Sequence, residues 1–582
     1  MNNISSKSEF EGVVTAVARP PLLRRILNAS KWILRRYCFL GHERRFFDYF
    51  AARRSGKAQD RDSIITVQCP EDPFYFFLFG EIACALRAQM PIRVELIVLR
   101  SLRSPPNGKS LRSLFRQIAR WLYANRLTDR KWTALYQSYA DGVAYRSAPP
   151  LAPWTELRNW FRADRLWRSV TSKDELVAME ADGILIGDLV ADSYIRWRPS
   201  PVLRLNDPYL RKVIRQALRD LHRSRAYFGK KRPALFLTSY TSYVQHGIAA
   251  RMAVQLGVRV QSFGNFQEFS KTITVEDSCH SRRFDQYSEQ FDQLDNREEK
   301  ITAADQRLAA RLGGAIDDEI SFMKSSSYGT HALDIPDVSG AVIIFLHDFY
   351  DSAHAYRWML FHDFWEWICF TIEALRERKI PFFLKPHPNQ DAASAADCDR
   401  LRALYPGLDF LPAQVSNRQL VEGGMSCAVT VYGTVVSEMA YLGVPAISCA
   451  DNPNIGFEIG RSARTREQYL AFLDGHAQLP RNSEAMRREA CSFYFMQNLN
   501  LMEAELALRD KFVRQVFKMI EAERTDEWNA AEIIDDFRSM AASAGFAKFV
   551  GDLAAAVSSI SAADPLDRSS LPSSPTLFAA RN

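Results

Sequence analysis

The sequence lacks any apolar run long enough to cross a bilayer. A membrane-spanning helix needs about 18 to 20 consecutive apolar residues, whereas the longest apolar stretch, residues 74–86, is interrupted by Gly80 and Glu81. The first residues also lack the charged-then-apolar order that is typical of a signal peptide. We therefore expect a cytoplasmic protein.

Paired cysteines are missing as well. The chain has nine cysteines, an odd number, and no two of them are separated by only two residues. Several lie within apolar segments, which is typical of buried free thiols in a reducing compartment. The nine are Cys38, Cys69, Cys84, Cys279, Cys369, Cys398, Cys427, Cys449 and Cys491.

Neither sign of charge dominates the chain. The 75 basic and 68 acidic side chains leave a net charge of +7, which is mild for 582 residues and does not indicate a nucleic-acid partner. Basic residues nevertheless gather in residues 24–57 and 101–131, where aromatic and aliphatic residues separate them. These segments are either solvated faces or contacts with an anionic inner membrane, and we expect peripheral membrane contact.

Alternating apolar strands and helical segments predict two α/β domains, because a chain of this length is too long for one core. Strand, helix and strand joined by short turns build a parallel sheet. We therefore predict an α/β fold with two Rossmann-like domains facing across a cleft, followed by C-terminal helices. The expected strands are residues 64–67, 92–99, 183–188, 234–238 and 258–263 in the first half, and 341–346, 380–384, 408–411, 427–431 and 444–448 in the second.

Lys385 and His387 follow the strand expected at residues 380–384. Pro386 and Pro388 remove backbone donors and stiffen the loop, which fixes where the two basic side chains point. Open α/β sheets bind ligands outside the carboxyl ends of their strands. A cation and an imidazole at that edge suit a nucleotide phosphate, although a rigid exposed turn is the simpler alternative.

A second polar motif, Gly433-Thr434 with Ser437-Glu438, follows the strand expected at residues 427–431 and opens a helix. Thr434 and the free amides behind it can bind a phosphate at the helix N-terminus, or Thr434 can simply cap its own helix. Glu438, one turn further, suits ribose hydroxyls.

Catalytic candidates follow strands in both halves. Asp188 and Asp192 come after the strand expected at residues 183–188, and Glu268 follows the one expected at 258–263. Each is a potential base for an acceptor hydroxyl, with loop capping as the alternative, and His347 is expected to point into the cleft between the domains. Tyr240, His246 and Arg251 flank a strand–helix turn in the same half.

A metal site is the alternative for the loop at residues 347–354. His347, Asp351 and His354 are residue types that bind metals, but their spacing matches no established metal motif. We therefore expect neither a metal nor a cofactor.

Together, the Lys385–Pro388 motif, Gly433-Thr434 with Ser437-Glu438, and Gly443-Val444-Pro445 resemble the donor domain of GT-B glycosyltransferases of bacterial capsule and lipopolysaccharide synthesis. The resemblance covers about residues 180–455. It implies that Lys385 and His387 contact the donor phosphate and that Thr434 and Ser437 complete the phosphate site. It further implies that Glu438 holds the ribose, and that the first domain provides the acceptor site and the catalytic base.

The resemblance implies a transferase that moves a sugar from a CMP- or UDP-linked donor to a surface polysaccharide or glycolipid, by an inverting mechanism without a metal. The alternatives are a CDP-glycerol-type polyol-phosphate transferase, a UDP-sugar 2-epimerase and a non-catalytic membrane-associated assembly protein. The domains expected are a basic aromatic extension (1–60), an acceptor domain (61–330), a donor domain (338–490), C-terminal helices (491–558) and a disordered tail (559–582).

Overall fold

The computed structural model describes most of the chain. Glu268, most of the basic residues of 24–57 and 101–131, and the end of the expected tail lie outside the described residues. Those described are 38–54, 63–99, 102, 128–147, 151–198, 200–263, 270–277, 282–315, 332–356, 358–388, 392–500 and 528–562.

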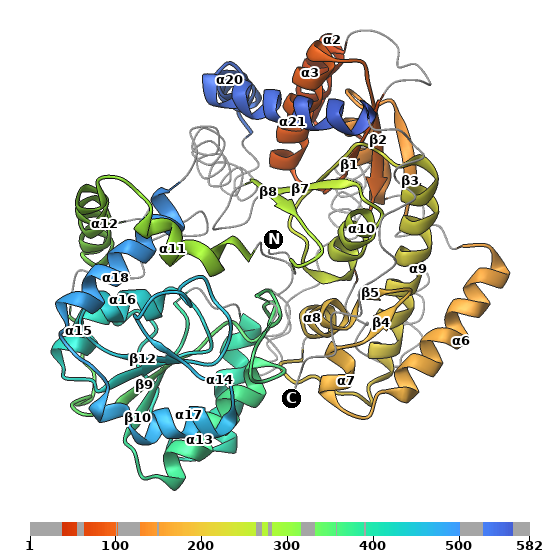
Figure 1. Ribbon diagram of the computed structural model, residues 1–582. Coiled ribbons are helices and arrows are strands. Elements are labelled where there is room, and N and C mark those ends of the chain that lie inside the picture. The colour runs from red at the N-terminus through yellow and green to blue at the C-terminus, as the bar shows by residue number, and fades with distance from the viewer. Residues whose placement is uncertain are drawn as a thin grey trace, which may run out of the picture.

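A six-stranded sheet forms the centre of the first domain (Figure 1). Its strand order is β3-β2-β1-β6-β7-β8, and all neighbouring pairs are parallel except β7 with β8. The order reverses between β1 and β6, which is where open α/β sheets form a ligand-binding crevice. The strands are β1 (Ser63–Gln68), β2 (Ile92–Val98), β3 (Gly142–Arg146), β6 (Leu235–Thr238), β7 (Arg259–Phe263) and β8 (Ser270–Ile273).

The helices of this domain begin where the sequence provides caps. Asp72 accepts hydrogen bonds from the amides of Phe74 and Tyr75 at the start of α3, where Pro73 takes the first helical position. Helix α3 is apolar nearly all round, so it is buried as a core helix. The helices are α2 (Gly41–Arg53), α3 (Pro73–Gln89), α5 (Thr128–Tyr136), α6 (Pro153–Ser169), α7 (Lys173–Val177), α9 (Pro208–Lys231) and α10 (Tyr243–Gln255).

The interpretation of residues 183–188 as a strand of the main sheet is wrong. A short antiparallel hairpin precedes a helix there, and Asp182 and Gly183 turn it with positive φ angles of 57° and 74°. An Asp-Gly pair with positive φ at both positions is typical of a two-residue type I′ turn. The elements are β4 (Glu180–Ala181), β5 (Ile184–Leu185) and α8 (Gly187–Trp197), so Asp188 and Asp192 lie one turn apart on a helix.

The second sheet has five strands, all parallel, in the order β10-β9-β11-β12-β13. Its order reverses between β9 and β11. The strand expected at residues 408–411 is reduced to one isolated bridge between Phe410 and Leu384, and β13 is the fifth strand instead. The strands are β9 (Val342–Phe345), β10 (Phe382–Lys385), β11 (Cys427–Val429), β12 (Ala446–Ser448) and β13 (Arg461–Ser462).

Two sheets, parallel except for the β7–β8 pair and each layered with helices, confirm the predicted α/β fold with two Rossmann-like domains (Figure 1). Of the expected helices around the second sheet, those at residues 392–404 and 417–422 form with these bounds. The helices are α11 (Tyr287–Asp292), α12 (Arg297–Leu312), α13 (Phe364–Glu377), α14 (Ala392–Leu404), α15 (Asn417–Glu422), α16 (Val435–Tyr441), α17 (Arg466–Asp474) and α18 (Glu484–Tyr494).

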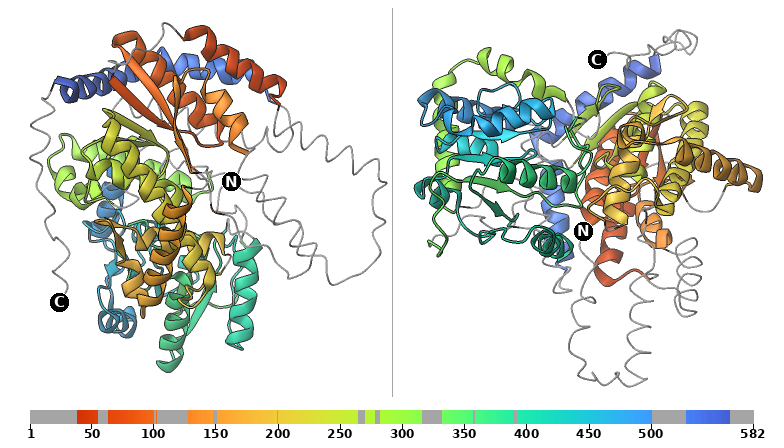
Figure 2. Two further views of the ribbon diagram at one scale, coloured as in Figure 1. Left: turned by 90° about the vertical axis from the view of Figure 1, so that its right-hand side faces the viewer. Right: turned by 90° about the horizontal axis from the view of Figure 1, so that it is seen from below.

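The chain crosses between the two domains more than once. Leu308 of α12, in the stretch that sequence analysis assigned to the first domain, is buried with Met439 and Cys491 in the core around the second sheet. The last described helices, α20 (Ala530–Ala541) and α21 (Ala544–Ala562), lie beside α3 of the first domain (Figures 1 and 2). There Phe537 stacks on Phe77, with ring centroids 4.7 Å apart.

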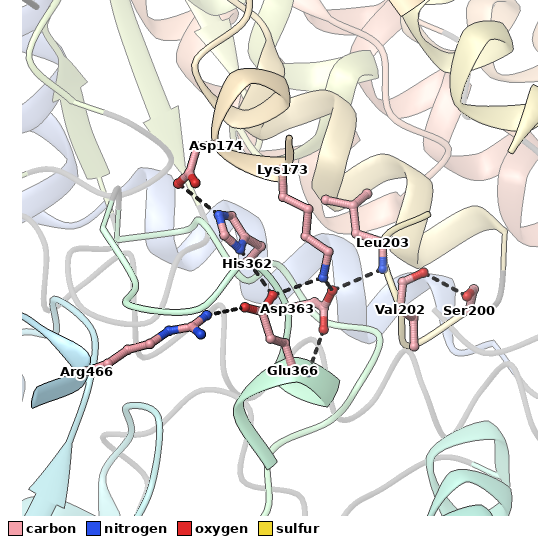
Figure 3. A network of polar contacts seen from close by, with 9 residues as sticks. All are labelled: Lys173, Asp174, Ser200, Val202, Leu203, His362, Asp363, Glu366 and Arg466. Atoms are coloured by element: carbon pink, nitrogen blue, oxygen red, sulfur yellow. Dashed lines mark hydrogen bonds and ion pairs between the residues drawn. The ribbon is translucent and has the colours of Figure 1, made fainter. Parts of the chain in front are cut away.

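A polar network joins the domains at the start of α13 (Figure 3). The Lys173 ammonium of the first domain lies 2.8 Å from Asp363 and 2.9 Å from Glu366 of the second. Asp363 also caps α13 by accepting from the Glu366 amide, and it accepts from the Leu203 amide of the first domain. Because the Asp363 side chain is fully buried, its charge depends on these partners.

His362 extends the same network (Figure 3). Its Nε2 lies 2.9 Å from Asp174 of the first domain and its Nδ1 lies 3.1 Å from Glu366. Burial works against the charge of Glu366, but His362 and Lys173 lower its pKa to about 2. The contact between the domains at the start of α13 is therefore a network in which acidic and basic side chains compensate one another.

Within the described residues, no single helix has both the length and the apolar character needed to span a bilayer. One pair, Ala530–Ala541 with Ala544–Ser559, meets those criteria jointly, with a bend of 65° between its members. The eight cysteines in the part of the chain that the structure describes are all free thiols.

Two helical glycines differ in the space around them, which gives a test of the packing. A Cβ on Gly80 of α3 would lie 2.5 Å from the buried Phe50 ring, whereas nothing lies within 4 Å of one on Gly229 of α9. We expect Gly80→Ala to destabilise the protein by about 1–3 kcal/mol through overpacking. Gly229→Ala should be neutral or stabilising by up to about 1 kcal/mol. Urea denaturation measures both, and equal effects would contradict this packing.

Candidate functional site

The loops that follow β9, β10 and β11 meet at the reversal of the second sheet. The His347 ring, directly after β9, stacks on Phe364 at 4.6 Å between centroids and lies 5.1 Å from the Tyr432 ring. The His387 ring, after β10, lies 6.4 Å from His347. Three separate loops thus bring His347, His387 and the turn before Gly433 together.

Lys385 is a buried cation at this edge. Only 5% of the residue is exposed, and its ammonium donates to the Ala413 carbonyl oxygen at 3.3 Å. The ammonium also lies over the Phe345 ring, 5.6 Å from its centroid. Burial lowers the pKa of Lys385 to about 8, although Glu438 acts in the opposite direction.

His387 lies in an environment that disfavours its charged form. Burial, together with the neighbouring His347 and Lys385, lowers its pKa to about 4. A bound anion would stabilise the charged forms of both Lys385 and His387. The edge of this sheet is therefore suited to an anionic ligand.

The motif at residues 433–438 divides between surface and interior. Gly433 has a φ of +139°, which favours glycine, and Thr434 is exposed at the start of α16 without a side-chain cap bond. Ser437 is buried, and its hydroxyl donates to the Thr434 carbonyl oxygen at 2.9 Å. Thr434 is thus the hydroxyl of this motif that faces outward.

Glu438 is buried rather than on the surface. Its carboxylate lies 2.6 Å from the Arg311 guanidinium of α12 and accepts from the Asn417 side-chain amide at 2.7 Å. Arg311 Nη2 also lies 3.4 Å from the Thr434 hydroxyl. Arg311 and Asn417 therefore hold the Glu438 carboxylate in the interior, and Arg311 links it to Thr434.

Asp192 of the first domain meets the loop after β9. Its carboxylate lies 2.7 Å from His354 Nδ1, and each residue is at most 5% exposed. Burial raises the pKa of Asp192. Burial alone would lower the pKa of His354, but the Asp192 carboxylate raises it. This buried contact joins α8 of the first domain to the loop after β9 of the second.

Further bonds hold the loop after β9 in place. The Tyr432 hydroxyl donates to the Ser352 carbonyl oxygen at 2.8 Å, and Arg196 of α8 donates to the Tyr350 carbonyl oxygen at 3.4 Å. The loop is therefore fixed from the second sheet on one side and from α8 on the other.

Asp188, one turn before Asp192, is held by an arginine. Arg251 of α10 binds both of its carboxylate oxygens, at 2.7 and 2.6 Å, and Arg251 also donates to the Leu185 carbonyl oxygen. Asp188 additionally accepts from the Leu189 amide. These bonds fasten α8 to α10 and to the preceding hairpin.

The reversal of the first sheet has a polar cluster of its own. The Gln68 side chain at the end of β1 accepts from the Ser239 amide and hydroxyl, both at 3.0 Å, and donates to His246 Nδ1 at 2.6 Å. Burial lowers the pKa of His246 to about 3, so its ring is neutral. This cluster orients His246 at the crevice expected between β1 and β6.

Sequence reasoning missed several of these partners. His354 was considered only as a metal ligand, and Arg311 and Gln68 were not singled out at all. The sequence separations of Arg311 from Glu438 and of Asp192 from His354 are 127 and 162 residues. One local signal was available, because Asp182-Gly183 between apolar residues favours a hairpin and hence the helix that bears Asp192. Among the described residues, no group of three or more His, Cys, Asp or Glu side chains could hold a metal ion.

The buried Lys385 gives a test by pH. Its charge is lost as the pH rises through about 8, so the affinity for UDP or CMP should fall above pH 8, approaching tenfold per pH unit. Lys385→Met should bind weakly at pH 7 with a flat profile to pH 9.5, while Lys230→Met, at an exposed site, should behave as wild type. Isothermal titration calorimetry measures these affinities, and a flat wild-type profile would remove Lys385 from the ligand site.

No protein-family model and no curated protein sequence matches the chain. Solved structures with some similarity include the glycotransferase of kitacinnamycin, at 13% identity over 79% of this chain and 99% of that chain, with a TM-score of 0.25. KpsC of Thermosulfurimonas dismutans, a β-Kdo 2,4 transferase, is 14% identical over 45% of this chain and 79% of that chain, with a TM-score of 0.28. The UDP-GlcNAc 2-epimerase of Neisseria meningitidis is 9% identical over 75% and 99%, with a TM-score of 0.22.

Proposed function

We propose that the protein is a glycosyltransferase of the GT-B type that uses a nucleotide-sugar donor, CMP- or UDP-linked. The acceptor is a bacterial surface polysaccharide or glycolipid, and the reaction takes place in the cytoplasm, next to the inner membrane. Transfer inverts the anomeric centre and needs neither a metal nor another cofactor.

The observation that supports this proposal most is the position and charge of Lys385 and His387. Lys385 is the last residue of β10 and His387 follows it, next to the reversal of the second sheet, and burial lowers the pKa of each. Open α/β sheets bind nucleotides at such a reversal. The negative charge of a donor diphosphate or monophosphate would favour the protonated forms of both side chains.

The chemistry follows from these groups. The acceptor oxygen attacks the anomeric carbon of the donor sugar while the bond from that carbon to the phosphate oxygen breaks. The charge that develops on the leaving phosphate is stabilised by the Lys385 ammonium, His387 and the exposed Thr434 hydroxyl. Because cationic side chains already serve the leaving group, turnover should persist in EDTA.

The acceptor must also lose its hydroxyl proton to a base. Asp192 is the best placed of the four candidates, because its pair with His354 lies where α8 meets the loop after β9. In this assignment the Asp192 carboxylate accepts the proton, and His354 orients that carboxylate. Asp188 is engaged by Arg251, His347 is stacked on Phe364, and Glu268 lies outside the described residues.

Turnover of a donor panel tests the proposal directly. The purified protein is incubated with CMP-, UDP- and CDP-linked donors and lipid or glycan acceptors, and the released nucleotide and products are identified by mass spectrometry. The proposal requires a glycosylated acceptor. Transfer of a polyol phosphate to the acceptor, epimerised UDP-sugar alone, or nucleotide binding without turnover would each contradict it.

His387→Ala should lower the transfer rate by at least about 100-fold, as expected for the loss of one preorganised donor to the leaving group. His476→Ala, a histidine of the same domain bonded to Ser426 outside the site, is the matched control and should stay within a few fold of wild type. Steady-state kinetics measures both. Near-wild-type activity of the His387 variant would exclude a role in transfer.

The two aspartates of α8 should differ in their effects. Asp192→Asn removes the base without changing the shape of the side chain, so transfer should fall at least about 100-fold while nucleotide affinity stays within a few fold. It should also lower the thermal midpoint, because it takes the charged partner of His354 away. Asp188→Asn weakens the bond to Arg251 and should mainly lower the thermal midpoint. If Asp192→Asn abolishes nucleotide binding as well, or if transfer survives, the assignment of the base is wrong.

A further inference from the structure

Helix α6 exposes an unusual number of large apolar side chains. Within the described residues, seven such side chains are strongly exposed, and four of them lie on this one helix. The four exposed fractions are 82% for Trp154, 44% for Leu157, 38% for Trp160 and 57% for Phe161. Isolated exposed apolar residues need no explanation, but a cluster on one helix marks an interaction surface.

The helix has two opposite faces. Asn159 and Ala163 are buried, and Leu166 packs against the same core, so these positions face α9. Since an α-helix turns by about 100° per residue, Trp154 and Phe161 lie on the side opposite to that face. Trp154 and Phe161 therefore belong to the outer surface of α6, whereas Trp160 lies at its edge, beside Arg211 of α9.

The charges on α6 are also asymmetric. Its two acidic side chains are engaged, since Glu156 binds Arg219 and Asp164 binds Arg211 of α9. Arg158, Arg165 and Arg168 are exposed on the outer half of the helix. Asp164 also pairs with Arg168, so the positive charge of the outer face comes mainly from Arg158 and Arg165. An apolar face bordered by arginines is complementary to an anionic surface.

We propose that α6 is an interfacial helix that docks the protein on an anionic lipid bilayer. Trp and Phe side chains bury in the region between headgroups and acyl chains, and arginines bind the lipid phosphates around them. Figures 1 and 2 show α6 on the outside of α9, on the side of the first domain away from the second sheet, where a flat bilayer can reach it. This inference does not depend on sugar transfer.

The experiment uses the full chain and vesicles of phosphatidylcholine, with or without phosphatidylglycerol, in a sedimentation assay without any donor. The double variant Trp154→Ser/Phe161→Ser should bind anionic vesicles at least about tenfold more weakly than wild type. Leu404→Ser, a 56%-exposed apolar residue on α14, is the matched control and should bind as wild type. Arg158→Gln/Arg165→Gln should weaken binding at low salt, and Lys230→Gln/Lys231→Gln should not.

Equal thermal midpoints of the double variant and wild type show that a loss of binding is not a loss of folding. Three results would overturn the proposal: no preference of wild type for anionic vesicles at low salt, unchanged binding of the double variant, or a change in hydrodynamic size of that variant without lipid. Unchanged binding would assign the contact to another surface, such as the basic residues 24–57. A change in hydrodynamic size would instead show that the outer face of α6 contacts a second copy of the chain.

Discussion

The buried contact between Asp192 and His354 is the interaction on which the geometry of the site depends. Neither residue is more than 5% exposed, and the two belong to different domains. A buried charge without its partner costs several kcal/mol, so each side chain holds the other in place. This contact holds α8 against the loop after β9. The ion pair between Lys173 and Asp363, at the start of α13, is a second contact that holds the two domains together.

The same desolvation that makes this contact rigid also prepares the second sheet for an anion. Burial lowers the pKa values of both Lys385 and His387, and the buried Glu438 carboxylate, which acts on Lys385, is shared with Arg311 and Asn417. Burying these two basic side chains therefore costs stability at the edge of the sheet, and a bound phosphate would offset that cost. Ligand sites are commonly built on such a local conflict between burial and charge.

The sequence predicts the sheets better than the contacts. Buried parallel strands are short apolar runs, so β1, β2, β6, β7, β9 and β10 could be recognised, and with them the loop bearing Lys385 and His387. The run at residues 183–188 is equally apolar, but the Asp182-Gly183 turn makes it a hairpin. Residues that pair, such as Arg311 and Glu438, lie on elements far apart in the sequence, and no local sequence pattern specifies which elements will pack together.

The central claim is that a nucleotide binds at the carboxyl edge of the second sheet, between the loops after β9, β10 and β11. Hydrogen–deuterium exchange with and without saturating UDP or CMP tests it most directly, because it reports on every backbone amide of those loops. The account predicts protection confined to residues 346–354, 385–387 and 431–438 and their neighbours. Protection at the edge of the first sheet instead, around Gln68 and residues 239–246, would contradict it.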